Sequence, residues 1–183
     1  VLGGMGGGVG TFDFYSSGGI NAYSEKYPAA FIMNGGEISN NKSKWNSNTT
    51  GADYGCGGGV YIASNKVVLN AGTISNNTAQ RQGGGVYVST VPYILHMYNS
   101  VVKDNHAIAL GGGLWACPTG GTTINVTDGA AIHSNSSDGA GDDIAAVRYT
   151  SNYKTTLAER LLGGGLVKWY QDGGIIGGEV GTV

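Results

Sequence analysis

The sequence predicts an all-β fold: a right-handed single-stranded parallel β-helix (solenoid) of about five coils with a C-terminal cap or extension. Two observations lead to it: a glycine triplet that recurs before short alternating segments, and an asparagine that recurs after an aliphatic residue. Glycine accounts for 35 of the 183 residues, hydrophobic residues for 40% and charged residues for only 12%. Such a chain has apolar side chains for a core, is rich in turns, and lacks the high charge of a disordered polypeptide.

The first half of the repeat is three glycines, an aliphatic residue and an aromatic residue. Full copies lie at 57–62, 83–88 and 111–116, with a partial copy at 6–9 and a degenerate one at 141–144. Glycine adopts backbone angles closed to other residues, so each triplet predicts a turn into a short strand. We expect the aliphatic residue of each copy to face the interior: Val9, Val60, Val86, Leu114 and Ile144.

The second half is an apolar stretch, a small-residue turn, an aliphatic residue and an asparagine three positions later. It lies at 31–41 and 67–77, with looser copies at 95–105 and 124–135. Stacked copies would place four asparagines over one another: Asn41, Asn77, Asn105 and Asn135. Stacked amides hydrogen-bond to each other and to turn backbone, so we predict a structural asparagine ladder; a ligand site is the alternative.

These repeats predict one solenoid domain over residues 1–150. The triplets that begin at 57, 83 and 111 are 26 and 28 residues apart, and a unit of this size buries its apolar face only by stacking on a copy of itself. Longer spacing predicts loop insertions near 12–27 and 42–54. The pattern then breaks, so we expect residues 151–183 to be a C-terminal cap or a linker to a following domain.

The aromatic residues after the triplets are the candidate ligand-binding residues. Tyr61, Tyr87 and Trp115 occupy equivalent places in successive copies, directly after an inward aliphatic residue. Because side chains alternate along a strand, we expect the three rings to face outward as a stripe that could contact a glycan or a protein. The alternative is structural stacking of the rings under a covering loop.

An acidic group supplies the candidate catalytic residues. Asp138, Asp142 and Asp143, with His133 nearby in the sequence, would serve an alternative function as a polysaccharide-degrading hydrolase or lyase. These acids fall where the triplet degenerates, and aspartates at turns commonly cap backbone amides, which is the interpretation we favour. Residues 138–143 also faintly resemble a calcium-binding nonapeptide that occurs only once here, so we predict no metal.

Several function classes are disfavoured. The net charge is −2 without a basic stripe, which argues against nucleic acid as a partner, and the apolar runs are too short for this segment to insert into a membrane. His96, His106 and His133 lack metal-ligand spacing, and the triplets lack the lysine of a phosphate loop, so we expect no cofactor. Cys56 and Cys117 fall at different repeat positions, which makes a disulfide between them awkward.

The residues quoted above carry a resemblance to a known group. An aliphatic residue, Ser and Asn-Asn, followed by Gly-Gly-Gly-Val-Tyr, resembles bacterial right-handed β-helix repeats and the polymorphic outer-membrane-protein repeats of autotransporter adhesins, over roughly residues 3–144. The resemblance implies an extracellular or cell-surface, adhesin-like or stalk segment of a longer polypeptide, with host glycan or surface protein as possible partners. It implies no catalytic set. A purely structural segment without a ligand stays open.

Overall fold

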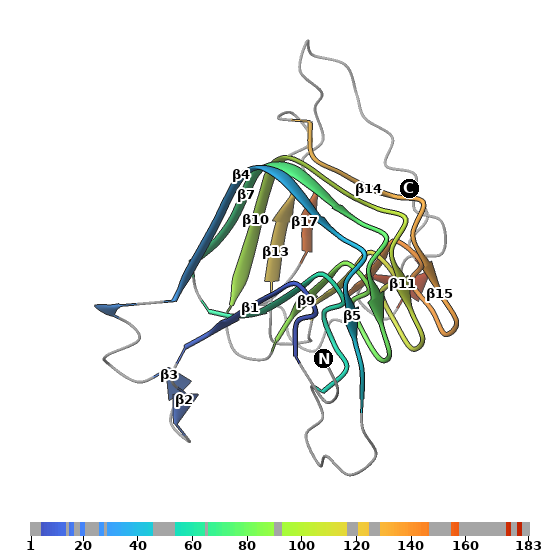
Figure 1. Cartoon of the computed structure of the whole chain (residues 1–183), viewed down its shortest axis with the longest axis horizontal. Helices are drawn as coiled ribbons and strands as arrows, with labels where there is room; N and C mark the ends of the chain where they lie inside the picture. The colour runs from blue at the N-terminus through green and yellow to red at the C-terminus, as the bar shows by residue number, and fades with distance from the viewer. Residues whose placement is uncertain are drawn as a thin grey trace.

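The protein is a parallel β-helix, seen here in a computed structural model. The structure describes residues 5–13, 15–16, 19–20, 26–27, 29–45, 54–64, 66–89, 93–116, 121–124, 129–146, 155–157, 175–176 and 179–180. All named elements in this part of the chain are β-strands, and most of them pair in parallel between successive coils (Figure 1). The predicted all-β solenoid is confirmed, whereas the number of coils stays a prediction.

The strands of successive coils form three parallel sheets, which we call sheets 1, 2 and 3. Sheet 1 contains β1 (Val9–Phe12), β6 (Val60–Ala63), β9 (Val86–Val88), β12 (Leu114–Ala116), β16 (Ile144–Ala146), β18 (Ile175–Ile176) and β19 (Glu179–Val180). Its pairing is parallel except between β18 and β19, which are antiparallel. Sheet 2 contains β4 (Ala30–Ser39), β7 (Lys66–Ser75), β10 (Ile94–Lys103), β13 (Gly121–Ile124), β14 (Ala131–His133) and β17 (Thr155–Leu157). Sheet 3 contains β5 (Lys42–Ser43), β8 (Thr78–Ala79), β11 (His106–Ala107) and β15 (Ser136–Ser137).

The register between coils follows the repeat residue by residue. In sheet 1, Val60 pairs with Val86 and with Val9, and the column continues through Leu114 to Ile144. In sheet 2, the aliphatic residue before each asparagine is paired with its equivalent: Ile38, Ile74, Val102 and Ile132. These columns, together with Met33, Leu69 and Met97, fill the interior of the coils. Direct stacking of like on like therefore builds the core.

Three segments bear on the predicted boundaries. The stretch near 12–27 contains an antiparallel hairpin of β2 (Tyr15–Ser16) and β3 (Gly19–Ile20). Lys42 and Ser43, the first residues of the second predicted insertion, form β5 in sheet 3, and residues 46–53 of that insertion lie outside the described residues. Past residue 150, β17 adds to sheet 2 and β18 to sheet 1, and parallel pairing thus continues into the predicted C-terminal cap or linker.

Between sheet 3 and sheet 1 the chain makes a bend that stacks as regularly as the strands. Figure 1 shows the chain leaving sheet 3 and folding back toward β9 and β1. The bends are joined by backbone hydrogen bonds, from Ala109 N to Arg81 O at 2.8 Å and from Ala140 N to Ala109 O at 3.2 Å. The first glycine of each triplet ends the bend, at a positive φ of 67° for Gly83, which favours glycine.

At the opposite corner, each turn from sheet 2 into sheet 3 contains a residue in the left-handed conformation. The residue immediately before each ladder asparagine has a positive φ of 54° to 58°: Asn40, Asn76, Asp104 and Ser134. Asparagine and aspartate tolerate this region, because their short polar side chains bond locally, whereas serine is less suited to it. The four described turns thus share a left-handed residue at the same place despite their varied sequence.

We predict that Leu69→Ala lowers the free energy of unfolding by about 2–5 kcal/mol, since it opens a cavity at a fully buried position of β7. Its neighbour Val68 faces outward on the same strand and is only half-buried. Val68→Ala is therefore the matched control, with a cost of about 1 kcal/mol or less. Urea unfolding followed by circular dichroism measures both, and equal losses would contradict the assigned faces of β7.

We predict that Ser134→Asn raises the free energy of unfolding by about 0.5–1 kcal/mol, because asparagine is several-fold enriched in the left-handed region. The reciprocal exchange Asn76→Ser, at the equivalent turn, should lower it by a similar amount. The same denaturation measurement tests the pair. If both exchanges shifted stability in one direction, the turn conformation would not be their cause.

Candidate functional site

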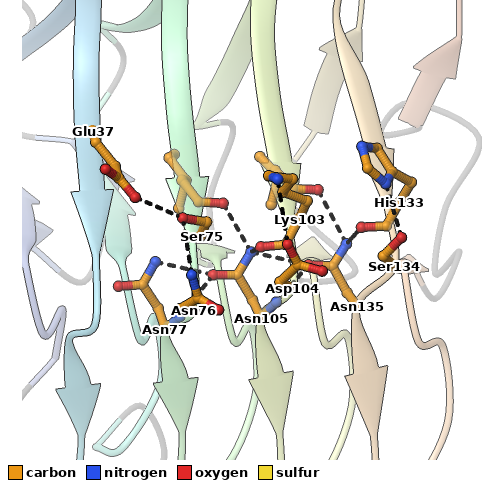
Figure 2. A network of polar contacts seen from close by, with 12 residues as sticks. Glu37, Ser75, Asn76, Asn77, Lys103, Asp104, Asn105, His133, Ser134 and Asn135 are labelled. Carbon is orange, nitrogen blue, oxygen red and sulfur yellow. Dashed lines mark hydrogen bonds and ion pairs between the residues drawn. The ribbon is translucent and has the colours of Figure 1, made fainter.

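The asparagine after each turn lies in one continuous column between sheets 2 and 3. Asn41 donates from its backbone N and from Nδ2 to Asn77 Oδ1, both at 3.0 Å. Asn77 makes the same two bonds to Asn105 Oδ1, at 3.0 and 2.9 Å, and Asn105 makes them to Asn135 Oδ1, at 3.0 and 2.9 Å. Figure 2 shows Asn77, Asn105 and Asn135 side by side in the turns that follow successive strands. The structure thus brings the four predicted ladder residues together.

Ladder amides also hold the left-handed turns before them, as at Asn41, Asn105 and Asn135. Asn105 Nδ2 lies 2.9 Å from Lys103 O, two residues back, and 3.0 Å from Ile74 O in the preceding coil. Asn135 Nδ2 contacts His133 O at 2.9 Å and Val102 O at 3.1 Å in the same way. Asn77 and Asn105 are 1% exposed, so these bonds are shielded from water. The ladder therefore fixes the turn and joins adjacent coils.

The third glycine of each triplet leaves the space that the ladder fills. A Cβ on Gly85 would lie 2.9 Å from Asn105 Nδ2 and 2.7 Å from Gly113 O. A Cβ on Gly59 would meet Asn77 Nδ2 at 2.9 Å in the same manner. Since real Cβ atoms do not approach so closely, the glycine is required by the next coil. The two halves of the repeat are thus one packing unit.

Each of the four candidate catalytic residues contacts a different neighbour. Asp143 is 2% exposed, and its Oδ1 accepts hydrogen bonds from Asn135 N at 3.0 Å and Asn135 Nδ2 at 2.9 Å. Asp142 Oδ1 accepts from Ser137 N at 2.7 Å and from Ser137 Oγ at 3.3 Å. His133 is exposed and bonds to Ser134 Oγ. Both carboxylates are engaged with neighbouring backbone amides, as in the turn-capping interpretation.

Asp138 belongs to a surface group of three polar residues that the sequence did not reveal. His106 Nδ1 lies 2.9 Å from Ser136 Oγ, and His106 Nε2 lies 3.6 Å from Asp138 Oδ1. Stacking of β11 on β15 brings together residues 30 positions apart, so no local motif signals them. The side chains of His106 and Asp138 are 37% and 63% exposed. Water screens such an ion pair, and the arrangement is that of a solvated surface contact.

The aromatic residues after the triplets form a stack, but the predicted exposure is wrong. Tyr61, Tyr87 and Trp115 are only 2%, 3% and 6% exposed. The rings of Tyr61 and Tyr87 are stacked at 5.0 Å between centroids and 12° between planes. Phe12 extends the stack at the N-terminal end, 5.4 Å from Tyr61, and is itself half-exposed. The ligand-binding role stays a prediction, and burial favours the structural alternative.

The bend explains why side chains on the outer face of sheet 1 are buried. Tyr61, Tyr87 and Trp115 pack with Cys56, Ala145 and Leu110 in a second apolar cluster, separate from the coil interior. Cys56 and Leu110 come directly before the triplets, at the end of the bend. The first glycine turns the chain so that the bend covers the following strand from outside. Trp115 Nε1 is buried there without a hydrogen-bond partner among the described residues, and Cys117 lies outside them.

Within the described residues, no group of histidine, cysteine or acidic side chains is arranged to hold a metal ion. That part of the chain likewise contains no helix long and apolar enough to span a membrane.

Comparison with known proteins gives one family match. Residues 72–89 match the model of the Chlamydia polymorphic membrane protein repeat. This segment runs from the end of β7 through Asn77 and β8 to the triplet at 83–85 and β9. No curated protein and no solved structure matches the chain. The matched positions are those that build the ladder and the bend, so the similarity concerns the repeat.

We predict that Asn105→Ala lowers the free energy of unfolding by about 3 kcal/mol or more, because Asn77 N and Nδ2 lose their buried acceptor. Asn70→Ala is the matched control. Asn70 is exposed on the outer face of β7, where its Nδ2 bonds to Asn34 Oδ1 at 2.8 Å. Its loss should cost about 0.5 kcal/mol. Chemical denaturation compares the two, and similar costs would show that the inner column has no special role.

Proposed function

We propose that the chain is a non-catalytic, adhesin-like module of a longer bacterial cell-surface protein, and that it contacts host glycan or surface protein through the outer face of sheet 2. The match of residues 72–89 to a Chlamydia polymorphic membrane protein repeat supports a surface location and a longer parent chain. The stacked architecture supports a rod-like display role, because each coil fixes the position of the next.

The outer face of sheet 2 is the observation that carries the proposal. Its strands present outward side chains in register, one column consisting of Ile32, Val68 and His96. Two residues further along, Asn70 Nδ2 bonds to Asn34 Oδ1 across a register shift between β4 and β7, and Tyr98 follows His96 by the same spacing on β10. The sheet is long in this direction, since β4, β7 and β10 have 10 residues each. The face is therefore an extended, ordered surface.

The chemistry of this face suits contact with sugars or polar protein surfaces. Ile32 is 48% exposed, and the Asn34 and Asn70 amides are exposed beside it. The rings of His96 and Tyr98 lie nearly parallel, with centroids 6.5 Å apart and 13° between planes. Amides offer donors and acceptors to hydroxyl groups, and aromatic rings offer a flat apolar surface with a polar edge. The face thus combines the groups that a neutral polar ligand would use.

By contrast, two of the candidate catalytic residues make hydrogen bonds within the stacked coils. Asp142 and Asp143 bond to Ser137 and Asn135. This engagement supports a scaffold in that region, and a display function elsewhere.

We predict that Tyr98→Ala and Asn34→Ala each weaken binding to glycan arrays or to host cells at least tenfold, at a cost in the free energy of unfolding of about 1 kcal/mol or less. Ile108→Ala is the control, because Ile108 is 47% exposed just after β11, away from sheet 2. Loss of binding in the control as well would remove sheet 2 as the contact face. If the unaltered chain bound no glycan and no cell, the proposal would be wrong, and the alternative of a purely structural segment without a ligand would stand. Release of reducing sugar from pectin or mucin, abolished by Asp138→Ala, would instead favour the enzyme alternative.

A further inference from the structure

The last triplet position that the structure describes has aspartates where the preceding ones have glycines. Residues 141–143 align with the triplets at 57–59, 83–85 and 111–113, and the shared neighbours Leu114 and Ile144 pair in sheet 1. The first glycine is kept, at a φ of 72° for Gly141. Asp142 and Asp143 replace the second and third. The exchange is thus confined to two of the three positions.

The structure explains why only these two positions can change. Gly112 and Gly113 have no positive φ, so their backbone shape is open to other residues. What requires glycine there is the following coil. A Cβ on Gly112 would meet Ser136 O, and a Cβ on Gly113 would lie 2.6 Å from Asn135 Nδ2. A side chain at these positions is therefore compatible only with a coil that is not followed by another in sheet 3.

Asp143 occupies the place of the next ladder asparagine. Its Oδ1 accepts from Asn135 N at 3.0 Å and Nδ2 at 2.9 Å, the same pair of bonds that Asn135 Oδ1 accepts from Asn105. The column of amides is thereby completed by a carboxylate from the same coil, eight residues after Asn135. Ladder donors at this end are satisfied without a further coil.

Asp142 likewise supplies a hydrogen-bond acceptor in place of a following coil, here at the edge of sheet 3. β15 is the last strand of this sheet in the described chain. Ser136 N and Asp138 N donate back to the preceding coil, to Asn105 O and Ala107 O. In a parallel strand the intervening Ser137 N points to the other side. There Asp142 Oδ1 accepts it at 2.7 Å, in place of a carbonyl from a following strand.

We propose that Asp142 and Asp143 form a terminator that ends the asparagine ladder and closes sheet 3 to strand addition by a following coil or a second copy. Sheets 1 and 2 each gain a further strand, β18 and β17, while sheet 3 ends at β15 among the described residues. The carboxylates supply the acceptors that a next coil would supply, and their bulk excludes that coil. An unpaired edge is a site of unwanted pairing, so such a closure has a physical advantage.

The test moves the terminator one coil earlier in the full-length chain. In G112D/G113D, the introduced carboxylates should accept the amides of Asn105 and Ala107 and displace the coil that follows. We expect amide hydrogen exchange over residues 129–146 to accelerate at least tenfold, with exchange over 66–89 unchanged within twofold. Slow exchange should persist at the Asn105 amide itself.

G112A/G113A is the matched control, since it introduces the same steric conflict without carboxylates. It should release residues 129–146 and also accelerate exchange at Asn105. Equal exchange at Asn105 in the two variants would overturn the proposal, because bulk alone would then account for both.

The reverse change tests the native position without a steric conflict. D142G/D143G should accelerate exchange at the Asn135 and Ser137 amides at least tenfold and produce concentration-dependent self-association on size-exclusion chromatography. Unchanged exchange at these two amides would show that the aspartates do not close the edge.

Discussion

The approach of one coil to the next at the third glycine of each triplet is the constraint on which the structure depends. At Gly59 a Cβ would lie 2.7 Å from Gly85 O and 2.9 Å from Asn77 Nδ2, so the space is shared by a backbone and a ladder amide. A glycine in one coil and an asparagine 18 residues later are thus two parts of one contact. Because this contact fixes the coils in register, Val60 meets Val86 in sheet 1 and Ile74 meets Val102 in sheet 2. Core columns follow from the ladder as much as from their own hydrophobicity.

The same contact stabilises a turn that is locally unfavourable. Asp104 and Ser134 have φ values of 56° and 57°, a region that costs energy for residues other than glycine. The Asn105 and Asn135 amides bind the carbonyls on the far side of these turns and the adjacent coil at once. Local backbone shape and coil stacking are therefore coupled, because the amide that binds the turn also needs the adjacent coil to complete its hydrogen bonds. This coupling is what nearest-neighbour stabilisation means in a solenoid.

Much of this architecture was predictable because equivalent residues stack directly, so a repeat alignment is also a register. Inward columns and the asparagine column follow from sequence spacing alone. Burial of the aromatic stripe did not follow, because alternation tells which side of a strand a ring occupies, and not whether the chain later covers that side. Cys56 and Leu110, which provide the cover, have no shared chemistry that marks a bend. Likewise, from the sequence alone, Asp142 and Asp143 look like a loss of the repeat pattern. The backbone angles show that only the first glycine of a triplet is required for its conformation, and that the second and third are required because the next coil leaves no room for a side chain.

This division between conformational, packing and free positions also locates where function can vary. Residues 72–89, which match the Chlamydia repeat, consist largely of turn, ladder, bend and triplet positions. A change at any of them acts first on stacking, so similarity there is informative about the scaffold and silent about a ligand. On β4, β7 and β10, by contrast, the outward column changes from Ile32 to Val68 to His96, while Phe31, Val67 and Leu95 beside it stay apolar. Outward positions can change chemistry from coil to coil at little cost to the stack. A ligand specific to this chain is therefore to be sought on that face.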